Sequence, residues 1–373
     1  KDLPSKDWIN YVDIYLEKDT IVKTNHMKAT IQDPYVAGKD LDEFIHGWFS
    51  KGMPDLNVRN PFMATYLIQN SIWWVEYADL QGIRMDTYPY PDKEFMTDWT
   101  CAVMSEYPNF NIVGEEWHSD PVIVSFWQRG KENKNGYTSC LPSLMDFPLQ
   151  SDLVESLNEP GNEYFSGWKE VYETLAKDFL YSEPFNLVTF PDNHDMDRIF
   201  TQVNKDYGLF KLAIAYYATM RGIPQIYYGT EILMANDKKG DHGEIRTDFP
   251  GGWESDEINA FTGAGLSDEQ KESQAFMKDL LNWRKESEAV ANGKLMHYSP
   301  LPKSPYVYFR YTENDKVMVI LNKDSDKVEL DIERFSEMLE GNESGKDIIS
   351  GNTIDLSEGL VVPAMTPMII DFD

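Results

Sequence analysis

NLVTFPDNHDMDR (residues 186–198) joins a short apolar run to a polar segment that holds three aspartates and a histidine. A similar pattern occurs upstream, where GIRMD (82–86) and NIVGE (111–115) are short, largely apolar runs that end in an acidic residue. Runs that are apolar on both faces are typical of strands buried in a parallel sheet. The three segments therefore predict strands with an acidic residue at or just beyond their carboxyl ends.

Helical patterns separate these predicted strands, because apolar residues recur there at three- or four-residue spacing. The expected helices cover residues 62–80, 92–107, 168–181, 205–220 and 268–289. Two more strands are expected at 141–146 and 223–228. Short apolar strands that alternate with amphipathic helices indicate parallel βα units. The predicted fold is α/β, with about five βα units of a (β/α)8 barrel that lacks its first strands.

The pattern changes on both sides of this region. Residues 1–60 are irregular and punctuated by Pro and Gly, which predicts a loop-rich inserted domain that returns to the barrel. The partial barrel is then expected over 61–294. Residues 295–373 are β-rich, with a turn signal at 313–315, and predict a C-terminal antiparallel β-sandwich domain.

Charge and composition restrict the partners. Among 373 residues, 34 Lys+Arg face 63 Asp+Glu, and a net charge of −29 disfavours nucleic acid and anionic membranes as partners. No apolar run is long enough to predict a membrane span. The aromatic content of 13% allows some rings to line a sugar cleft, although core packing is the commoner role of any one ring. Cys101 and Cys140 allow one disulfide without requiring it.

Three carboxylates are expected at one end of the barrel. Asp86, Glu115 and Asp195 follow predicted strands, and the carboxyl ends of parallel strands share the face that carries chemistry in barrels. Like charges that converge raise carboxyl pKa values, as occurs at functional sites. With few histidines nearby, the pattern favours glycoside hydrolysis by a nucleophilic and a protonated carboxyl group. Helix N-capping is the competing interpretation of each single residue.

Neighbouring residues suit these two roles. Arg84 precedes Asp86 by two positions, so it lies on the same side of the strand, where its charge favours an ionised nucleophile. Gly114 leaves room beside Glu115. Trp117 is expected to shield Glu115 from water, which raises the pKa of a carboxyl group that acts as an acid.

The motifs resemble the conserved blocks of the α-amylase family, glycoside hydrolase family 13. The matching blocks are MPDLN (53–57), GIRMD, GEEW, FPDNHD and GIPQIYYGTE (222–231), in the family's order. RTDFPGGW (246–253) is similar to a segment of neopullulanase-like and cyclomaltodextrinase-like members. The resemblance implies retaining hydrolysis of α-glucosidic bonds in starch-type glucans, maltooligosaccharides, pullulan or cyclodextrins, with transglycosylation as a side reaction.

The resemblance also implies residue roles: Asp86 as nucleophile, Glu115 as acid/base and Asp195 as the third carboxylate. Substrate binding is implied for Arg84, His194, Arg198, Trp117, Tyr90, Asn57 and Tyr227. Asp192 and Asp197 are expected to be loop or capping residues. No cofactor is required. Some relatives bind calcium through a histidine after the nucleophile block, but Tyr90 occupies that position and the metal stays unassigned.

The sequence departs from the family's pattern at the start of the chain. The family's first block, an Asp-containing strand that ends in Asn-His, and the first three barrel strands are missing from these residues. We therefore expect an N-terminally incomplete enzyme that is inactive or impaired unless the missing part is supplied in trans. An exported bacterial enzyme fits the charge and the family, but the compartment and the oligomeric state stay open.

Two other classes of protein fit less well. Metal-dependent barrel hydrolases place His-x-His and further histidines at strand ends, whereas this chain has six histidines and no His-x-His. A non-catalytic glucan-binding or scaffold protein of the same fold usually loses one of the three carboxylates, and all three are present. DKKGDHGE (237–244) lacks the ligand pattern of a calcium loop and is expected to be a solvated loop on the active-site side.

Overall fold

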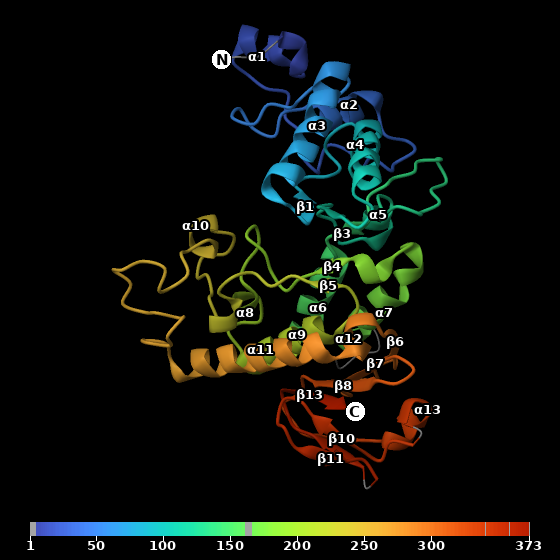
Figure 1. The fold of residues 1–373 in the computed structure, drawn as a ribbon, viewed down its shortest axis with the longest axis vertical. Helices are drawn as coiled ribbons and strands as arrows, with labels where there is room; N and C mark the ends of the chain where they lie inside the picture. Colours follow the sequence, from blue (N-terminus) through green and yellow to red (C-terminus); the bar gives the residue numbers. More distant parts are fainter. Residues whose placement is uncertain (1–4, 161–165, 340, 358, 373) are drawn as a thin grey trace. The chain divides into compact units, whose positions relative to one another are not determined.

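The computed structural model describes residues 5–160, 166–339, 341–357 and 359–372 (Figure 1). The chain divides into two compact units, which are Lys1–Phe147 with Phe179–Val188, and Pro148–Asp178 with Thr189–Asp373. The division falls inside the predicted barrel segment, so the three-domain division stays a prediction. Among the described residues, every helix is too short or too polar to serve as a membrane span.

The first unit contains the parallel sheet that the sequence predicts. Its strands are β1 (Gly82–Met85), β2 (Asn111–Gly114) and β3 (Ser143–Leu144), in the order β1-β2-β3. β2 pairs in parallel with both neighbours, so Val113 lies opposite Arg84 on one side and Ser143 on the other. The carboxyl ends of the three strands therefore lie at the same edge of the sheet.

Capping residues begin the two long helices of this unit. The helices are η1 (Lys6–Trp8), α1 (Val12–Lys18), α2 (Gly38–His46), α3 (Pro61–Ala78), α4 (Lys93–Glu106), α5 (Pro121–Ser125) and η3 (Pro184–Asn186). The Asn60 side chain accepts hydrogen bonds from the first backbone N–H groups of α3, and Asp92 does the same for α4. The short helices before α3 confirm the expectation of short elements in a loop-rich N-terminal segment.

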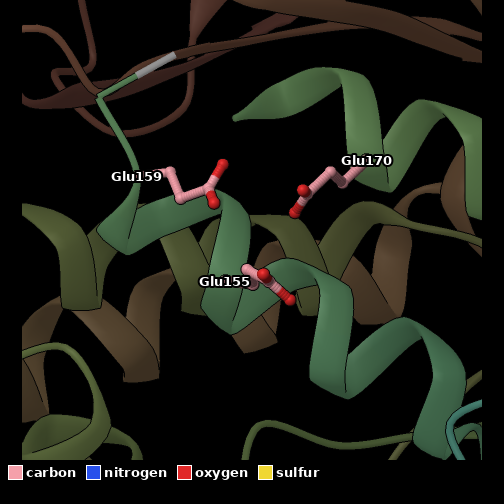
Figure 2. Close-up of side chains that lie close together, drawn as sticks. All are labelled: Glu155, Glu159 and Glu170. Atoms are coloured by element: carbon pink, nitrogen blue, oxygen red, sulfur yellow. The ribbon is translucent and has the colours of Figure 1, made fainter. Parts of the chain in front are cut away.

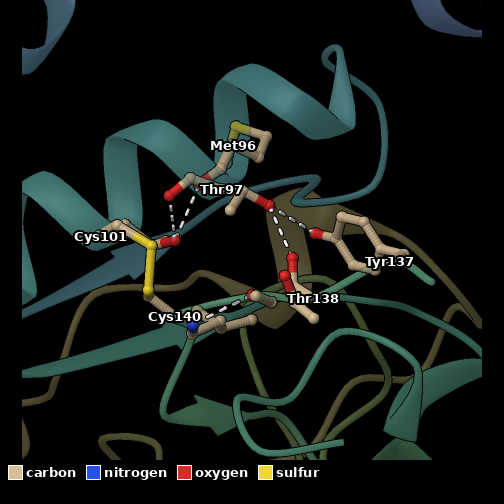
Figure 3. Close-up of a disulfide and its surroundings, with 9 residues drawn as sticks. Met96, Thr97, Cys101, Tyr137, Thr138 and Cys140 are labelled. Carbon is tan, nitrogen blue, oxygen red and sulfur yellow. Dashed lines mark hydrogen bonds between the residues drawn. A yellow bond between two sulfur atoms is a disulfide. The ribbon is translucent and has the colours of Figure 1, made fainter. Parts of the chain in front are cut away.

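A disulfide fixes α4 to the segment before β3 (Figure 3). Cys101 on α4 bonds to Cys140, with their Cα atoms 5.0 Å apart. Beside it, the Thr97 hydroxyl contacts the Tyr137 hydroxyl at 3.2 Å and the Thr138 carbonyl at 3.1 Å. Because α4 also packs on α3, this cross-link holds the layer of helices against the sheet that carries the candidate site.

The other helices include several that the sequence did not predict. They are α6 (Phe147–Asn158), α7 (Trp168–Ala176), η2 (Asp178–Leu180), α8 (Ile199–Gln202), α9 (Tyr207–Thr219), η4 (Thr230–Ile232), α10 (His242–Ile245), α11 (Asp268–Glu286) and α12 (Glu288–Asn292). Strands β4 (Val188–Thr189) and β5 (Ile223–Pro224) lie in the last two predicted strand segments. The strand expected at 141–146 is limited to β3, and α6 begins soon after it. Pro148 is tolerated there because backbone N–H groups in the first turn of a helix have no acceptor within the helix, so the donor that proline lacks is not missed.

The C-terminal residues form the predicted antiparallel domain. The larger sheet has the order β11-β10-β13-β8-β7-β6, and a smaller sheet pairs β12 with β9. Their strands are β6 (Lys294–His297), β7 (Tyr306–Tyr311), β8 (Lys316–Asn322), β9 (Val328–Leu330), β10 (Ser344–Asp347), β11 (Thr353–Asp355), β12 (Leu360–Val362) and β13 (Thr366–Asp371), accompanied by η5 (Ile332–Phe335) and α13 (Ser336–Leu339). The backbone of Thr312 bonds to that of Asp315 at 2.8 Å, which confirms the predicted turn between β7 and β8.

The two faces of the larger sheet enter different cores. Phe309 and Ile320 belong to the core that the sheet shares with β9 and β12. Tyr308 and Val319 point the opposite way, into the core built around the almost fully buried helix α9. The hydroxyl of Tyr308 lies 2.5 Å from that of Thr219 at the end of α9. The β domain therefore packs on helices of its own unit, as a stabilising domain does.

Candidate active site

One arginine connects the two carboxylates that sequence reasoning placed on neighbouring strands. The Arg84 guanidinium lies 2.6 Å from a Glu115 carboxylate oxygen, and its other terminal nitrogen pairs with Asp86. The predicted contact between Arg84 and Asp86 is therefore present. It arises because alternate residues of β1 and its extension project to the same side of the sheet.

Glu115 lies in an environment that favours its protonated form. The residue is only 4% exposed, while the Asp86 side chain is 57% exposed. Burial raises the pKa of Glu115 above its ordinary value, and the charge of Asp86 adds to that effect. The backbone N–H of Thr87, 2.9 Å from the carboxylate, and the Arg84 guanidinium act in the opposite direction. A buried carboxyl group whose pKa is raised, next to an exposed carboxylate, is the combination that suits general acid catalysis.

The residues around Glu115 are close-packed. A Cβ atom on Gly114 would lie 2.8 Å from the Leu141 side chain and 3.0 Å from the Tyr88 ring, so only glycine fits there. The following residue, Glu116, is also buried and accepts a 2.7 Å hydrogen bond from the indole N–H of Trp127. Burial raises the pKa of Glu116 to about 7. Glu116 is therefore fixed in the core, which leaves Glu115 as the candidate acid/base.

Asp195, the third predicted carboxylate, lies in the second unit among basic side chains. His194 Nε2 lies 3.0 Å from one of its carboxylate oxygens. The Arg246 guanidinium pairs with the other oxygen, and His242 Nδ1 is 3.7 Å from that same oxygen. Arg246 also donates to the His194 carbonyl at 2.8 Å. The structure thus places Asp195 in contact with His194 and within a basic cluster, while sugar contact by His194 stays a prediction.

Sequence reasoning missed Arg246 and His242. Arg246 is the first residue of the RTDFPGGW segment, which matched relatives without suggesting a role. His242 lies in the segment expected to be a solvated loop, whereas its last residues form the helix α10. The basic character of Arg246 within a recognised motif was the one signal available. Its 51-residue separation from Asp195 gave no indication of contact.

The two remaining aspartates of FPDNHDMDR have the structural roles predicted for them. Asp192 is fully buried and accepts a 2.7 Å hydrogen bond from the backbone N–H of Ile199, the first residue of α8. Burial raises the pKa of Asp192 to about 6. Asp197 accepts hydrogen bonds from the Asn236 side chain at 2.8 Å and the Gly240 backbone at 2.7 Å. Both residues shape the loop that presents Asp195.

Two predicted substrate-binding residues contact each other. The Arg198 guanidinium lies 4.0 Å above the Tyr227 ring and donates to the carbonyl of Ile245 at 3.0 Å. Arg198 has no exposed surface, so in this structure it holds Tyr227 and the end of α10 in place. Sugar contact by either residue stays a prediction.

The other predicted substrate-binding residues lie in the first unit. Tyr90 is buried among aromatic rings and lies edge-on to Phe44 at 5.2 Å. Trp117 is 38% exposed and stacks on Phe147 at 4.9 Å, so it offers surface for a sugar. The Asn57 amide donates to the carbonyl of Asp7 at 2.8 Å. Their roles in substrate binding, and convergence of Asp195 with Asp86 and Glu115, stay predictions.

A separate acidic cluster lies on α6, just after it, and on α7 (Figure 2). One oxygen from each of Glu155, Glu159 and Glu170 lies within 4.8 Å of the others. Burial and the neighbouring carboxylates raise the pKa of Glu170 to about 7, and the Lys323 ammonium is 2.5 Å from the Glu159 carbonyl. None of these residues belongs to the predicted catalytic set. Protonation and the lysine both offset the repulsion, so the cluster by itself does not define a metal centre.

Two strand-end carboxylates that share one arginine, in a unit with a parallel sheet, fit the pair of carboxyl groups that glycoside hydrolases use. The chain belongs to the α-amylase family. The family model described as "Alpha amylase, catalytic domain" matches residues 1–289. A second model, "Cyclo-malto-dextrinase C-terminal domain", matches residues 295–371.

Curated relatives agree with this assignment. Cyclomaltodextrinase from Thermoanaerobacter pseudethanolicus is 26% identical over 275 residues, which are 73% of this chain and 42% of that protein. Maltogenic α-amylase from Bacillus acidopullulyticus is 27% identical over 291 residues, covering 75% of this chain and 44% of that protein. The chain thus spans less than half the length of these relatives.

Solved structures confirm the fold of the family. The α-amylase from Geobacillus thermoleovorans in complex with acarbose has a TM-score of 0.73 and 23% identity, and covers 99% of this chain and 72% of that one. An Anoxybacillus α-amylase has a TM-score of 0.75 and 22% identity, covering 98% and 70%. The α/β catalytic fold and the C-terminal antiparallel β domain are therefore those of α-amylase-family enzymes.

Proposed function

We propose that this chain carries the catalytic machinery of a retaining α-glucosidic bond hydrolase. Its substrates are starch-type glucans, maltooligosaccharides, pullulan or cyclodextrins. The observation that carries the proposal is the bridge from Arg84 to both Asp86 and Glu115, in which Glu115 is buried and Asp86 is exposed. The similarity to cyclomaltodextrinases and maltogenic amylases supports the substrate class.

The closeness of the two carboxylates supports a retaining mechanism. Retaining glycosidases hold their carboxyl groups about 5–5.5 Å apart, while inverting enzymes leave room for a water at about 6.5–9.5 Å. A single guanidinium contacts both Asp86 and Glu115, and the Asp86 charge raises the pKa of Glu115. Both observations favour the shorter separation.

The proposed reaction has two steps. An Asp86 oxygen attacks the anomeric carbon while the glycosidic C–O bond breaks, and the Glu115 proton passes to the leaving oxygen. In the second step Glu115 takes a proton from water, and the water oxygen displaces Asp86 from the anomeric carbon. A sugar hydroxyl that replaces this water gives transglycosylation.

Asp195 has a different proposed role, which is to bind sugar hydroxyls and support the transition state. Arg246, His194 and His242 lie around its carboxylate oxygens, which are therefore held in place as acceptors of hydrogen bonds. His194, 43% exposed in its side chain, is proposed to contact the same sugar.

Product stereochemistry tests the proposal. Maltohexaose and β-cyclodextrin are incubated with a preparation of the chain that turns these glucans over, with the missing part supplied in trans where the chain alone is inactive, and the anomer formed first is followed by proton NMR. We expect the α-anomer before mutarotation, with no product from Asp86→Asn. Initial release of the β-anomer, or undiminished turnover by Asp86→Asn, would contradict the proposal.

A further inference from the structure

We propose that the segment of residues 246–261 is a binding platform for a glucose ring of an α-glucan, with Trp253 as its stacking surface. The inference rests on the proposed function, because the first residue of this segment, Arg246, contacts Asp195, which is proposed to bind the substrate. It gives a role to the RTDFPGGW segment, for which neither motif nor family assignment supplied one.

The segment is attached to the candidate catalytic carboxylate at its first residue. Arg246 pairs with Asp195, donates to the His194 carbonyl at 2.8 Å and contacts His242 at 2.9 Å. Three contacts at one guanidinium fix the start of the segment. A change in the position of the segment is therefore transmitted to Asp195.

Trp253 is held in one orientation although it is largely exposed. The residue is 65% exposed, yet its indole N–H donates to an Asp248 carboxylate oxygen at 3.0 Å. The Asp256 carboxylate accepts from the backbone N–H groups of Gly251 at 2.8 Å and Trp253 at 3.1 Å. With the polar edge of the ring already paired, the face of the ring is what solvent and ligands meet.

The rest of the segment supports this presentation. Gly251 has a φ of +99°, and a Cβ there would lie 2.9 Å from the Cα of Asn259, so the backbone closes tightly. The Ala260 N–H donates to the Pro250 carbonyl at 3.0 Å. Phe261, which is 74% exposed, lies edge-on to Phe249 at 5.1 Å. Two exposed aromatic residues are thus carried on a hydrogen-bonded scaffold.

The chemistry of the platform matches a neutral sugar. An aromatic face packs well on the C–H face of a pyranose ring, while carboxylates accept hydrogen bonds from hydroxyl groups. Asp248 lies at the edge of Trp253, and the exposed Glu254 and Glu257 flank it in the sequence. These carboxylates repel an anionic ligand, whereas a neutral glucan is not repelled.

Calorimetric titration of the chain with β-cyclodextrin and with maltoheptaose tests the platform. We expect Trp253→Ala to weaken binding of at least one probe by roughly five- to tenfold, the range for losing one stacked ring. Asp248→Ala keeps the ring but frees its N–H, and should weaken binding to a smaller extent. Trp74→Ala is the matched control, since Trp74 is also exposed, at 47%, but lies on α3 of the other unit.

The outcomes separate this inference from the proposed function. Equal affinity of Trp253→Ala and the unmodified chain would overturn the platform and leave the catalytic proposal intact. An equal loss in Trp74→Ala would also overturn it, because the effect would not be specific to this segment. Failure of the unmodified chain to bind either probe would overturn the platform too, and the anomer measurement would still judge catalysis separately. Thermal unfolding of each variant verifies that the fold is retained.

Discussion

The two units place their candidate catalytic carboxylates in opposite electrostatic settings. In the first unit two carboxylates, Asp86 and Glu115, share one arginine, and Glu115 is buried. In the second unit a single carboxylate, Asp195, is surrounded by Arg246, His194 and His242. Burial and the neighbouring Asp86 raise the pKa of Glu115 in the first setting, whereas the carboxylate oxygens of the second setting are paired with a guanidinium and lie beside imidazole groups. The first therefore suits proton transfer and the second suits hydrogen bonding to substrate.

Substitution of the first pair is expected to have the largest effect. In an active preparation of the chain, Asp86→Asn and Glu115→Gln should each lower kcat on maltohexaose by at least about 10³-fold, because one removes the nucleophile and the other the acid. With α-glucosyl fluoride, whose leaving group needs no proton, Glu115→Gln should recover much of the first step. Asp86→Asn should not. Equal losses on both substrates for both variants would show that the roles are assigned wrongly.

Removal of the guanidinium group that pairs with Asp195 is expected to have an intermediate effect. Arg246→Ala leaves Asp195 with its histidines alone, and should lower kcat/KM by about 10- to 100-fold, as loss of a charge-assisted contact does. Arg129→Ala is the control, since it breaks a pair with Glu183, 2.7 Å apart, that lies outside the candidate site. An equal loss of kcat/KM in Arg129→Ala and Arg246→Ala would contradict a specific role of Arg246 beside Asp195.

The smallest expected effect concerns Glu116 and appears in stability against pH. The folded-state pKa of Glu116 is raised to about 7 from 4.5, so the folded chain loses stability as pH rises from about 4.5 to 7. Glu116→Gln keeps an acceptor for Trp127 and removes this titration. Between pH 5 and pH 8 the difference in unfolding free energy should move in favour of the variant by about 1–3 kcal/mol.

Urea unfolding of both proteins at the two pH values measures this change. Asp192→Asn provides the parallel case in the second unit, where the pKa is raised to about 6 and the smaller shift predicts a smaller change. A difference between Glu116→Gln and the unmodified chain that does not vary with pH would contradict the buried, protonated state of Glu116.

Sequence patterns predicted what depends on neighbours along the chain. The strands of the first sheet follow from short apolar runs, and the contact between Arg84 and Asp86 follows from their two-residue spacing on one strand. The loop or capping role of Asp192 was predicted from its place in a polar segment after a strand, although the helix α8 that it caps was not. Each of these rests on local geometry that the sequence specifies directly.

Features that depend on chain folding over long separations were not predictable. Arg246 reaches Asp195 only because α10 and the loop before it fold back, and Arg198 is buried because Tyr227 and Ile245 close over it. For the same reason, the sequence allowed a disulfide between Cys101 and Cys140 but did not require it. Spacing alone carries no information about such contacts.

Trapping of the covalent intermediate tests the central claim most directly. An active preparation of the chain is incubated with 5-fluoro-α-D-glucosyl fluoride. The protein is then digested, and the labelled peptide is sequenced by mass spectrometry. We predict a single glycosyl label, carried on Asp86, that is absent from Asp86→Asn. A label on Glu115 or Asp195, or glucan turnover without a trapped intermediate, would contradict Asp86 as the nucleophile of a retaining enzyme.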